Sequence, residues 1–127
     1  MKYIMMVCVA VCMLVGCKPA AKTSDFDSVD AETFKTYVMG GDVQLLDVRT
    51  PEEYAVSHIE GALNLNVMDA SFATAVDSLD KNEPVYVYCR SGRRSKKAAD
   101  VLVGKGYKVL ELASGFNGWT QAGYAVK

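Results

Sequence analysis

The stretch Val85-Tyr86-Val87-Tyr88-Cys89-Arg90-Ser91-Gly92-Arg93-Arg94-Ser95 decides the expected fold and locates the expected chemistry. Its first four residues are β-branched or aromatic and predict a buried strand, which ends on Cys89. A short polar loop follows, and Ser95 opens a segment with helical spacing. This order places a thiol at the carboxyl end of a strand and beside the N-terminus of a helix. Open α/β sheets bind their ligands at such strand ends.

The loop after Cys89 favours a negatively charged sulfur. The start of a helix offers backbone N–H groups and a positive dipole end, and three arginines within five positions add full charges. A thiolate is stabilised by such surroundings. Arg90 and Arg93 are the better candidates to attract an oxyanion, whereas Arg94 ends the loop and also suits a structural ion pair. The alternative interpretation is a buried structural cysteine beside a solvated helix start.

The length of this loop separates two kinds of chemistry. From Cys89 to Arg94 the pattern is C-x4-R, one residue shorter than the C-x5-R loop of cysteine phosphatases and arsenate reductases. If the backbone N–H groups of the loop converge on one point, a shorter ring encloses a smaller object, such as a sulfur atom attached to Cys89. Gly92 gives the backbone the freedom that such a ring needs. This spacing resembles the active-site loop of the rhodanese (sulfurtransferase) family.

Two further segments resemble the same family. The first is Leu45-Leu46-Asp47-Val48-Arg49-Thr50-Pro51-Glu52-Glu53-Tyr54, followed by His58-Ile59-Glu60-Gly61-Ala62-Leu63-Asn64-Leu65. The second is Gly115-Phe116-Asn117-Gly118-Trp119 with Gly123-Tyr124. The resemblance covers about residues 26–127. The chain departs from the family pattern at turns: Ser114 replaces a common glycine, and a common proline is replaced by each of Glu60, Asn66 and Ala125. These changes affect turn rigidity and leave the active loop untouched.

The periodicity predicts strands that alternate with helices. Strands are expected at Val43–Val48, Ala62–Leu65, Val85–Tyr88 and Val109–Leu112. Helices are expected after the N-cap Asp30, from the capping box at Thr50, at Ser71–Leu79, at Ser95–Lys105 and around Trp119. The fold class is therefore α/β: a rhodanese-like, open, mainly parallel sheet with helices on both faces.

The candidate site residues fall into two groups. Cys89 is the expected catalytic nucleophile, and the loop that holds the substrate comprises Arg90, Ser91, Gly92, Arg93, Arg94 and Ser95. Asp47 could act as a base, but a carboxylate at a strand end more often caps a loop or pairs with an arginine. The resemblance implies that Asp47 is mainly structural and that His58 belongs to a turn, so Asp47, Arg49 and His58 are expected to support the site. A thiolate stabilised by the loop needs no His58 base.

The amino-terminal residues predict export and a lipid anchor. Lys2 precedes an apolar run from Tyr3 to Val15, which is too short for a membrane-spanning helix of about 20 residues and is typical of a signal peptide. Leu14-Val15-Gly16-Cys17 resembles a bacterial lipobox, in which the chain is cut before a cysteine that becomes diacylated. An ordinary cleaved signal with an incidental Cys17 is the alternative. Residues 1–16 would thus be removed, 17–25 would form a lipidated tether, and 26–127 the rhodanese-like domain.

The expected processing predicts where the mature protein lies and how many free thiols it has. The mature protein is expected as an exported bacterial lipoprotein on the periplasmic face of a membrane. Because Lys18 follows Cys17, the outer membrane is favoured if the cell is Gram-negative. Four cysteines occur in the sequence. Cys8 and Cys12 would leave with the signal and Cys17 would carry lipid, so Cys89 would be the only free thiol.

Composition excludes several partners. The single histidine and the single remaining cysteine cannot supply the usual set of nitrogen and sulfur metal ligands, so neither a metal site nor another cofactor is expected. The formal net charge of −1 argues against electrostatic binding of nucleic acid.

The resemblance implies a sulfurtransferase that carries sulfur as a Cys89 persulfide. Its expected partners are a small sulfur-containing anion such as thiosulfate and a thiophilic acceptor. The alternative is a sulfur-carrier or thiol-redox module that serves a specific protein thiol and has little activity on thiosulfate. A phosphatase or arsenate reductase is disfavoured by the loop length.

Overall fold

The computed structural model describes residues 25–127, which form an α/β fold around a parallel sheet. The sheet has five strands in the order β1-β5-β4-β2-β3, and every neighbouring pair is parallel. Its strands are β1 (Asp27–Val29), β2 (Gln44–Asp47), β3 (Leu63–Asn64), β4 (Val85–Tyr88) and β5 (Val109–Leu112). The strand that leads to Cys89, β4, therefore lies at the centre of the sheet.

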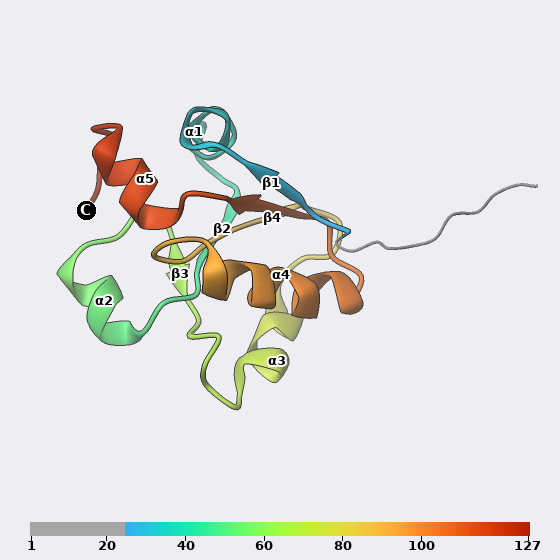
Figure 1. The fold of residues 1–127 in the computed structure, drawn as a ribbon. Helices are drawn as coiled ribbons and strands as arrows, with labels where there is room; N and C mark the ends of the chain where they lie inside the picture. The colour runs from blue at the N-terminus through green and yellow to red at the C-terminus, as the bar shows by residue number, and fades with distance from the viewer. Residues whose placement is uncertain (1–24) are drawn as a thin grey trace, which may run out of the picture.

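Helices cover both faces of this sheet (Figure 1). They are α1 (Ala31–Val38), α2 (Pro51–Val56), α3 (Phe72–Ala75), the 3₁₀ helix η1 (Val76–Ser78), α4 (Arg93–Gly104) and α5 (Gly115–Gln121). In Figure 1, α1 and α5 lie above the sheet, and α3 and α4 lie below it. The expected fold class is thus confirmed. None of the helices in residues 25–127 is both long enough and apolar enough to cross a membrane.

The alternation of side chains along β4 builds two separate cores. Val85 and Val87 face α4 and pack with Ala98, Ala99 and Leu102. The alternate residues Tyr86 and Tyr88 face the opposite side and pack with Phe34 and Trp119. Because successive residues of a strand point to opposite faces, Cys89 continues the row of Val85 and Val87 and enters the α4 core. The strand period therefore decides which helix meets the thiol.

Local signals explain most of the element boundaries. Asp30 caps α1 by accepting a hydrogen bond from the Thr33 N–H at 2.9 Å. Thr50 and Glu53 form the expected capping box, with Pro51 at the first position of α2. A proline and a capping box both favour the start of a helix. These two predictions are confirmed.

The expected strands Val43–Val48 and Ala62–Leu65 are each one residue shorter at both ends, and three other elements also differ from expectation. The edge strand β1 is short and mostly polar, so no apolar run marks it in the sequence. The predicted helix Ser71–Leu79 divides into α3 and η1, and within η1 the Leu79 N–H donates to the Val76 carbonyl at 3.1 Å, an i→i+3 bond. The Tyr107 hydroxyl lies 2.6 Å from the same carbonyl oxygen. Helix α4 begins at Arg93, before the expected Ser95.

Candidate active site

Cys89 lies at the carboxyl end of β4 with its side chain fully buried. The backbone N–H of Gly92 donates to Sγ at 3.1 Å. The Sγ atom also lies 3.4 Å from the hydroxyl oxygen of Ser95, in the first turn of α4. A sulfur atom that accepts from a loop amide at a helix start is in surroundings that stabilise negative charge.

Two glycines allow the active loop to pack closely. Gly92 has φ +101°, and a Cβ atom there would overlap the carbonyl oxygen of Ala113. Gly115 has φ +65°, and its Cβ would overlap the backbone of Arg90. From the same turn, the N–H of Phe116 donates to the Cys89 carbonyl at 2.7 Å and that of Asn117 to the Arg90 carbonyl at 3.0 Å. The start of α5 thus holds the loop in place.

Ser114 explains one departure from the family pattern. Its φ is −88°, a value that any residue adopts, so a second glycine is not required at this position. The positive φ that requires glycine belongs to Gly115 alone within this pair.

Arg94 connects the loop to α2. Its guanidinium donates to both carboxylate oxygens of Glu53, at 2.8 and 3.0 Å. The hydrogen bonds from Arg94 lower the pKa of Glu53 from 4.5 to about 2. The same bonds raise the pKa of Arg94, and the negative charge of Cys89 adds to this effect. Arg94 therefore holds the loop and contributes positive potential near the sulfur.

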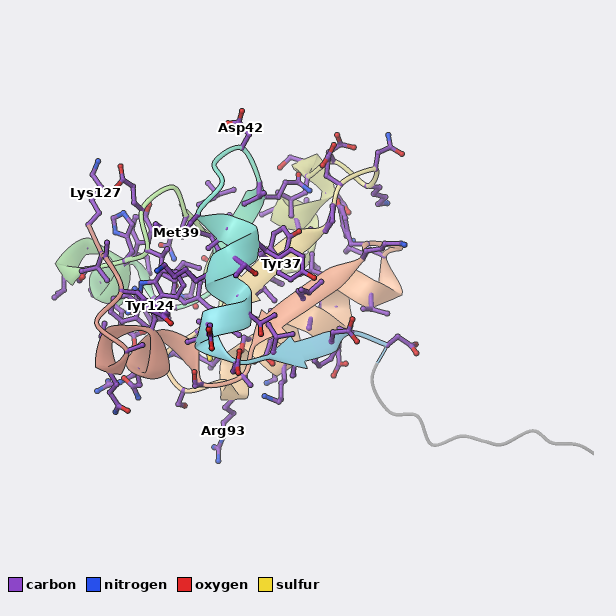
Figure 2. All side chains as sticks on the ribbon, turned by 90° about the horizontal axis from the view of Figure 1, so that it is seen from above. Tyr37, Met39, Asp42, Arg93, Tyr124 and Lys127 are labelled. Carbon is purple, nitrogen blue, oxygen red and sulfur yellow. The ribbon has the colours of Figure 1, made fainter. Side chains whose placement is uncertain are left out.

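The other two arginines differ in where they point. Arg90 lines a pocket of about 340 Å³ beside the loop, together with Arg49, Glu53, Val56, Phe116, Asn117 and Thr120. Arg93, at the first position of α4, is exposed and its side chain extends away from the domain (Figure 2). Ser91 is exposed at the top of the loop. Of the two arginines expected to attract an anion, Arg90 is the one that lines this pocket.

Asp47 and Arg49 form a buried ion pair next to the loop. Arg49 donates to Asp47 through Nε and Nη2, the latter at 2.7 Å, and Nη2 also donates to the Ser57 carbonyl at 2.7 Å. Burial would lower the pKa of Arg49, but its hydrogen bond with Asp47 holds that pKa above the ordinary value. The Arg49 guanidinium lies 4.3 Å from the ring centroid of Phe116, over the pocket wall.

Tyr88 completes this arrangement from the centre of the sheet. Its hydroxyl donates to Asp47 at 2.7 Å and accepts from the Ile59 N–H at 3.0 Å. Burial raises the pKa of Tyr88, and the charge of Asp47 raises it further. The carboxylate of Asp47 is thus occupied by Arg49 and Tyr88, an arrangement that suits support of the loop.

His58 lies in the turn after α2. Its ring stacks on Tyr54 with the ring centroids 3.7 Å apart, and Nδ1 lies 2.9 Å from the Tyr54 carbonyl oxygen. The backbone of His58 exchanges hydrogen bonds with Lys127, at 3.3 and 2.7 Å, which fixes the end of the chain. These contacts are those of a turn residue.

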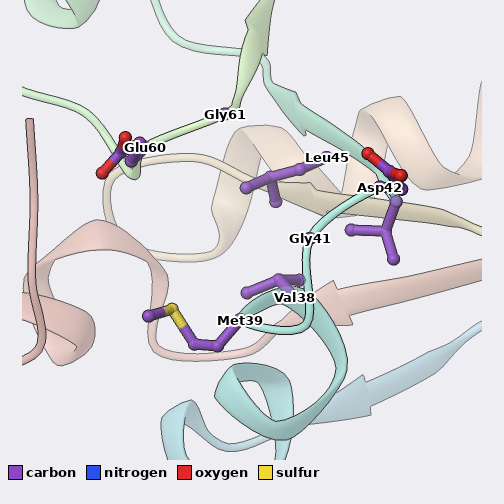
Figure 3. A pocket seen from close by; sticks show the side chains of 8 residues that line it. Val38, Met39, Gly41, Asp42, Leu45, Glu60 and Gly61 are labelled. Atoms are coloured by element: carbon purple, nitrogen blue, oxygen red, sulfur yellow. The ribbon is translucent and has the colours of Figure 1, made fainter.

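A larger cavity lies at the other end of the sheet. It measures about 420 Å³ and lies among the end of α1, the start of β2 and the turn before β3. Figure 3 shows Glu60 and Asp42 on opposite sides of it, with the side chains of Met39, Val38 and Leu45 between them. The cavity contains no nucleophilic side chain among its lining residues, and it faces the amino ends of the strands. The chemistry of the thiol belongs to the opposite end.

Glu111 lies at the site although it is not among the residues expected there. This residue is fully buried on β5, and its carboxylate accepts from Ser95 at 2.5 Å. The signal was present as a charged residue inside the otherwise apolar strand Val109–Leu112. Such a residue needs partners, because an unpaired buried charge is costly.

The close packing of Gly92 gives a prediction with a matched control. Gly92→Ala is expected to destabilise the protein by roughly 2–4 kcal/mol, because it adds backbone strain and overlaps Ala113. Gly106 has nearly the same φ, +98°, and open space around a Cβ atom. Gly106→Ala should therefore cost only the strain, about 1–2 kcal/mol. Denaturant unfolding of both variants measures this difference, and equal losses would show that the contact with Ala113 is unimportant.

Comparison with known proteins decides the family. Residues 30–122 match the rhodanese-like domain. The chain belongs to the rhodanese-like domain family. Thiosulfate sulfurtransferase PspE of Escherichia coli (strain K12) is 40% identical over 70 residues, which are 55% of this chain and 67% of PspE. The putative sulfur carrier protein YrkF of Bacillus subtilis (strain 168) is 32% identical over 99 residues, 76% of this chain and 52% of YrkF.

The fold of this rhodanese-like chain also matches solved structures. A rhodanese-related protein from Thermoplasma volcanium has a TM-score of 0.72 at 24% identity, over 80% of this chain and 98% of that protein. The chain spans about half of YrkF and two thirds of PspE. The likeness to the Thermoplasma volcanium protein supports the fold.

Proposed function

We propose that this protein is a sulfurtransferase that moves sulfane sulfur from a donor such as thiosulfate to a thiophilic acceptor through a persulfide on Cys89. The observation that carries the proposal is the buried Sγ of Cys89, which accepts from the Gly92 N–H at 3.1 Å. It lies in a C-x4-R loop of a rhodanese-like domain. The name of the relative PspE supports thiosulfate as the donor.

The first half-reaction loads the protein. The Cys89 thiolate attacks the outer sulfur of thiosulfate, so a new S–S bond forms at Sγ. The S–S bond of thiosulfate breaks, and sulfite leaves with its electron pair. Arg90, at the pocket beside the loop, is proposed to attract the sulfonate end of the donor. The Gly92 N–H and the start of α4 are proposed to stabilise the charge on the transferred sulfur.

The second half-reaction transfers the sulfur. A thiolate or cyanide attacks the outer sulfur of the persulfide, and Cys89 leaves as a thiolate. Because the first product departs before the acceptor reacts, ping-pong kinetics are expected. Initial rates at several fixed cyanide concentrations should give parallel double-reciprocal plots against thiosulfate. Intersecting lines would contradict a covalent intermediate, and no turnover would exclude thiosulfate as the donor.

A sulfur carrier for a specific protein is a second candidate. The name of YrkF favours it, and the exposed side chains of Ser91 and Arg93, on the loop that follows Cys89, are available to contact a protein acceptor. Such a carrier would transfer sulfur to its partner thiol and turn over free thiosulfate poorly. Comparison of the two rates separates the candidates.

We further propose that the protein is exported and held on the periplasmic face of a membrane by lipid on Cys17, which lies outside the described residues. Support comes from the lipobox-like Leu14-Val15-Gly16-Cys17. Two acyl chains anchor a protein stably where one binds only marginally. Full-length protein should therefore partition into detergent, and Cys17→Ala should abolish labelling by a fatty acid. Labelling that persists in Cys17→Ala would contradict lipidation at this residue.

A further inference from the structure

A buried carboxylate lies near the thiol, with the Ser95 hydroxyl between them. The two half-reactions of sulfur transfer assign no role to this carboxylate. Glu111 is fully buried on β5. Its Oε2 accepts from the Ser95 hydroxyl at 2.5 Å, and its Oε1 accepts from the Ser28 hydroxyl at 2.5 Å. The Lys96 ammonium lies 3.3 Å from both carboxylate oxygens. Glu111 is thus held by α4 on one side and by β1 on the other.

Ser95 stands between this carboxylate and the sulfur. Its hydroxyl oxygen lies 2.5 Å from Glu111 and 3.4 Å from Cys89 Sγ. A serine hydroxyl has one hydrogen to donate. A hydrogen bond to a charged carboxylate is stronger than one between neutral groups, so the hydrogen of Ser95 points to Glu111. A lone pair of the hydroxyl oxygen therefore faces Cys89.

This orientation of the Ser95 hydroxyl stabilises some chemical states of Cys89 more than others. A neutral thiol can donate its S–H to Ser95. A thiolate instead has its negative charge on Sγ, against the lone pair of Ser95 and the nearby carboxylate. In a persulfide, Sγ is a neutral sulfur with two bonds, and the negative charge lies on the outer sulfur, one bond further from Glu111. The Ser95 lone pair and Glu111 therefore destabilise the persulfide less than they destabilise the thiolate.

We propose that Glu111 is a positioning residue that turns the Ser95 hydroxyl away from Cys89 and so favours the sulfur-loaded protein over the free thiolate. This inference rests on the proposed function, because it concerns the stability of the persulfide. Its consequence is a protein that retains sulfur until an acceptor arrives and whose free thiolate reacts readily with a donor.

Other charges near this network must stay constant in any test. Lys96, on α4, pairs with Glu111 and also donates to the Gly92 carbonyl at 3.1 Å, so it links the carboxylate to the active loop. Arg94, on the same helix, interacts electrostatically with Cys89. From β1, the contacting group is the uncharged Ser28. Both cations are therefore left unchanged in the variants below.

Glu111→Gln tests the inference because it keeps the size of the side chain and reverses one hydrogen bond. The amide nitrogen can donate to the Ser95 oxygen, which frees the Ser95 hydrogen for Cys89. In full-length protein, the ultraviolet absorbance of the thiolate is titrated against pH, with Cys89→Ser as the blank. The midpoint of this titration should fall by about one pH unit in Glu111→Gln.

The second measurement follows loading itself. At alkaline pH, where Cys89 is ionised in both proteins, mixtures of thiosulfate and sulfite are equilibrated with each protein, and the loaded fraction is measured by mass. The equilibrium should shift about tenfold toward the unloaded protein in Glu111→Gln, since a hydrogen bond to an ionised group has that order of strength. An unchanged equilibrium would overturn the inference.

Three comparisons test whether Glu111 acts on Cys89 through the Ser95 hydroxyl. Asp100→Asn, an exposed change of the same charge on α4, should leave the titration unaltered. Ser95→Ala should raise the midpoint by about one unit when it is combined with Glu111→Gln, because it then removes a donor to the thiolate. In the natural protein it should not raise the midpoint, because Ser95 there presents a lone pair to the sulfur. A large rise in the natural protein would show that Ser95 already donates to the thiolate, which contradicts the inference even if Glu111→Gln does not fold.

Two other results of the Glu111→Gln titration would overturn the inference. A midpoint that rises in Glu111→Gln would mean that Glu111 accepts the thiol proton through Ser95. A midpoint that does not move would make Glu111 purely structural. The titration needs no sulfur donor, so it is separate from the proposed function. If the natural protein is not loaded by thiosulfate, the proposed donor fails, and a shifted titration would then support the control of Ser95 without the preference for the loaded state.

Discussion

Cys89→Ser is expected to remove sulfur transfer completely. A serine oxygen cannot accept sulfane sulfur to form a persulfide, and the two half-reactions both pass through this atom. The thiosulfate:cyanide rate should fall to that of the reaction without protein. Because serine is close to cysteine in size, the variant should remain folded with a loss of about 1 kcal/mol in unfolding free energy.

The measurement for Cys89→Ser is the rate of thiocyanate formation, with circular dichroism as the check of folding. The double variant Cys89→Ser/Ser91→Cys is a matched control. It returns a thiol to the exposed part of the loop without the contact to Gly92. It should not restore the rate. Activity that survives in folded Cys89→Ser would remove Cys89 from the mechanism.

Insertion of one alanine between Gly92 and Arg93 is expected to lower sulfur transfer about a hundredfold. The insertion converts C-x4-R to C-x5-R and moves the start of α4 relative to Cys89. The Gly92 N–H and the Ser95 hydroxyl contact Sγ from opposite sides of the insertion point, so the longer loop cannot keep both contacts. A misplacement of about an ångström in an active site can cost roughly a hundredfold in rate.

The control for this insertion is the same alanine between Lys81 and Asn82, in the exposed turn before β4. Loop lengthening costs little stability by itself, so the control should fold and keep its activity. The active-loop insertion also weakens the Arg94–Glu53 pair, which is one-quarter exposed and contributes about 1 kcal/mol at most. Full sulfur transfer by a folded active-loop insertion would show that ring size does not select the substrate.

The sequence predicted those parts of the fold whose signals are local. The bounds of β4 and β5 match because each is a mainly apolar segment of strand length, with Glu111 as the one charged residue in β5. The cap at Asp30 and the capping box at Thr50 involve residues three apart in the chain. The short β1 was missed because its pairing with β5 joins residues far apart in sequence, and its own composition is polar. The sequence of a short edge strand carries little signal of the distant strand with which it pairs.

The candidate site shows the same division. The position of Cys89 follows from the order of strand, loop and helix. The orientation of Arg93 depends on the residue at which α4 begins, and the expected start was two residues late. The role of Glu111 depends on β5 lying beside β4, which brings its carboxylate to Ser95 on the next helix. Periodicity along one strand cannot show which side chain of a neighbouring element it meets.

The mass of the purified full-length protein after treatment with thiosulfate tests the central claim most directly. Addition of one sulfur, about 32 Da, is predicted, located on the peptide that contains Cys89 and removed by dithiothreitol, because a thiol reduces the S–S bond of a persulfide. Cys89→Ser should gain no mass. An unchanged mass of the natural protein at saturating thiosulfate, or a gain that persists in Cys89→Ser, would contradict loading of Cys89 by this donor.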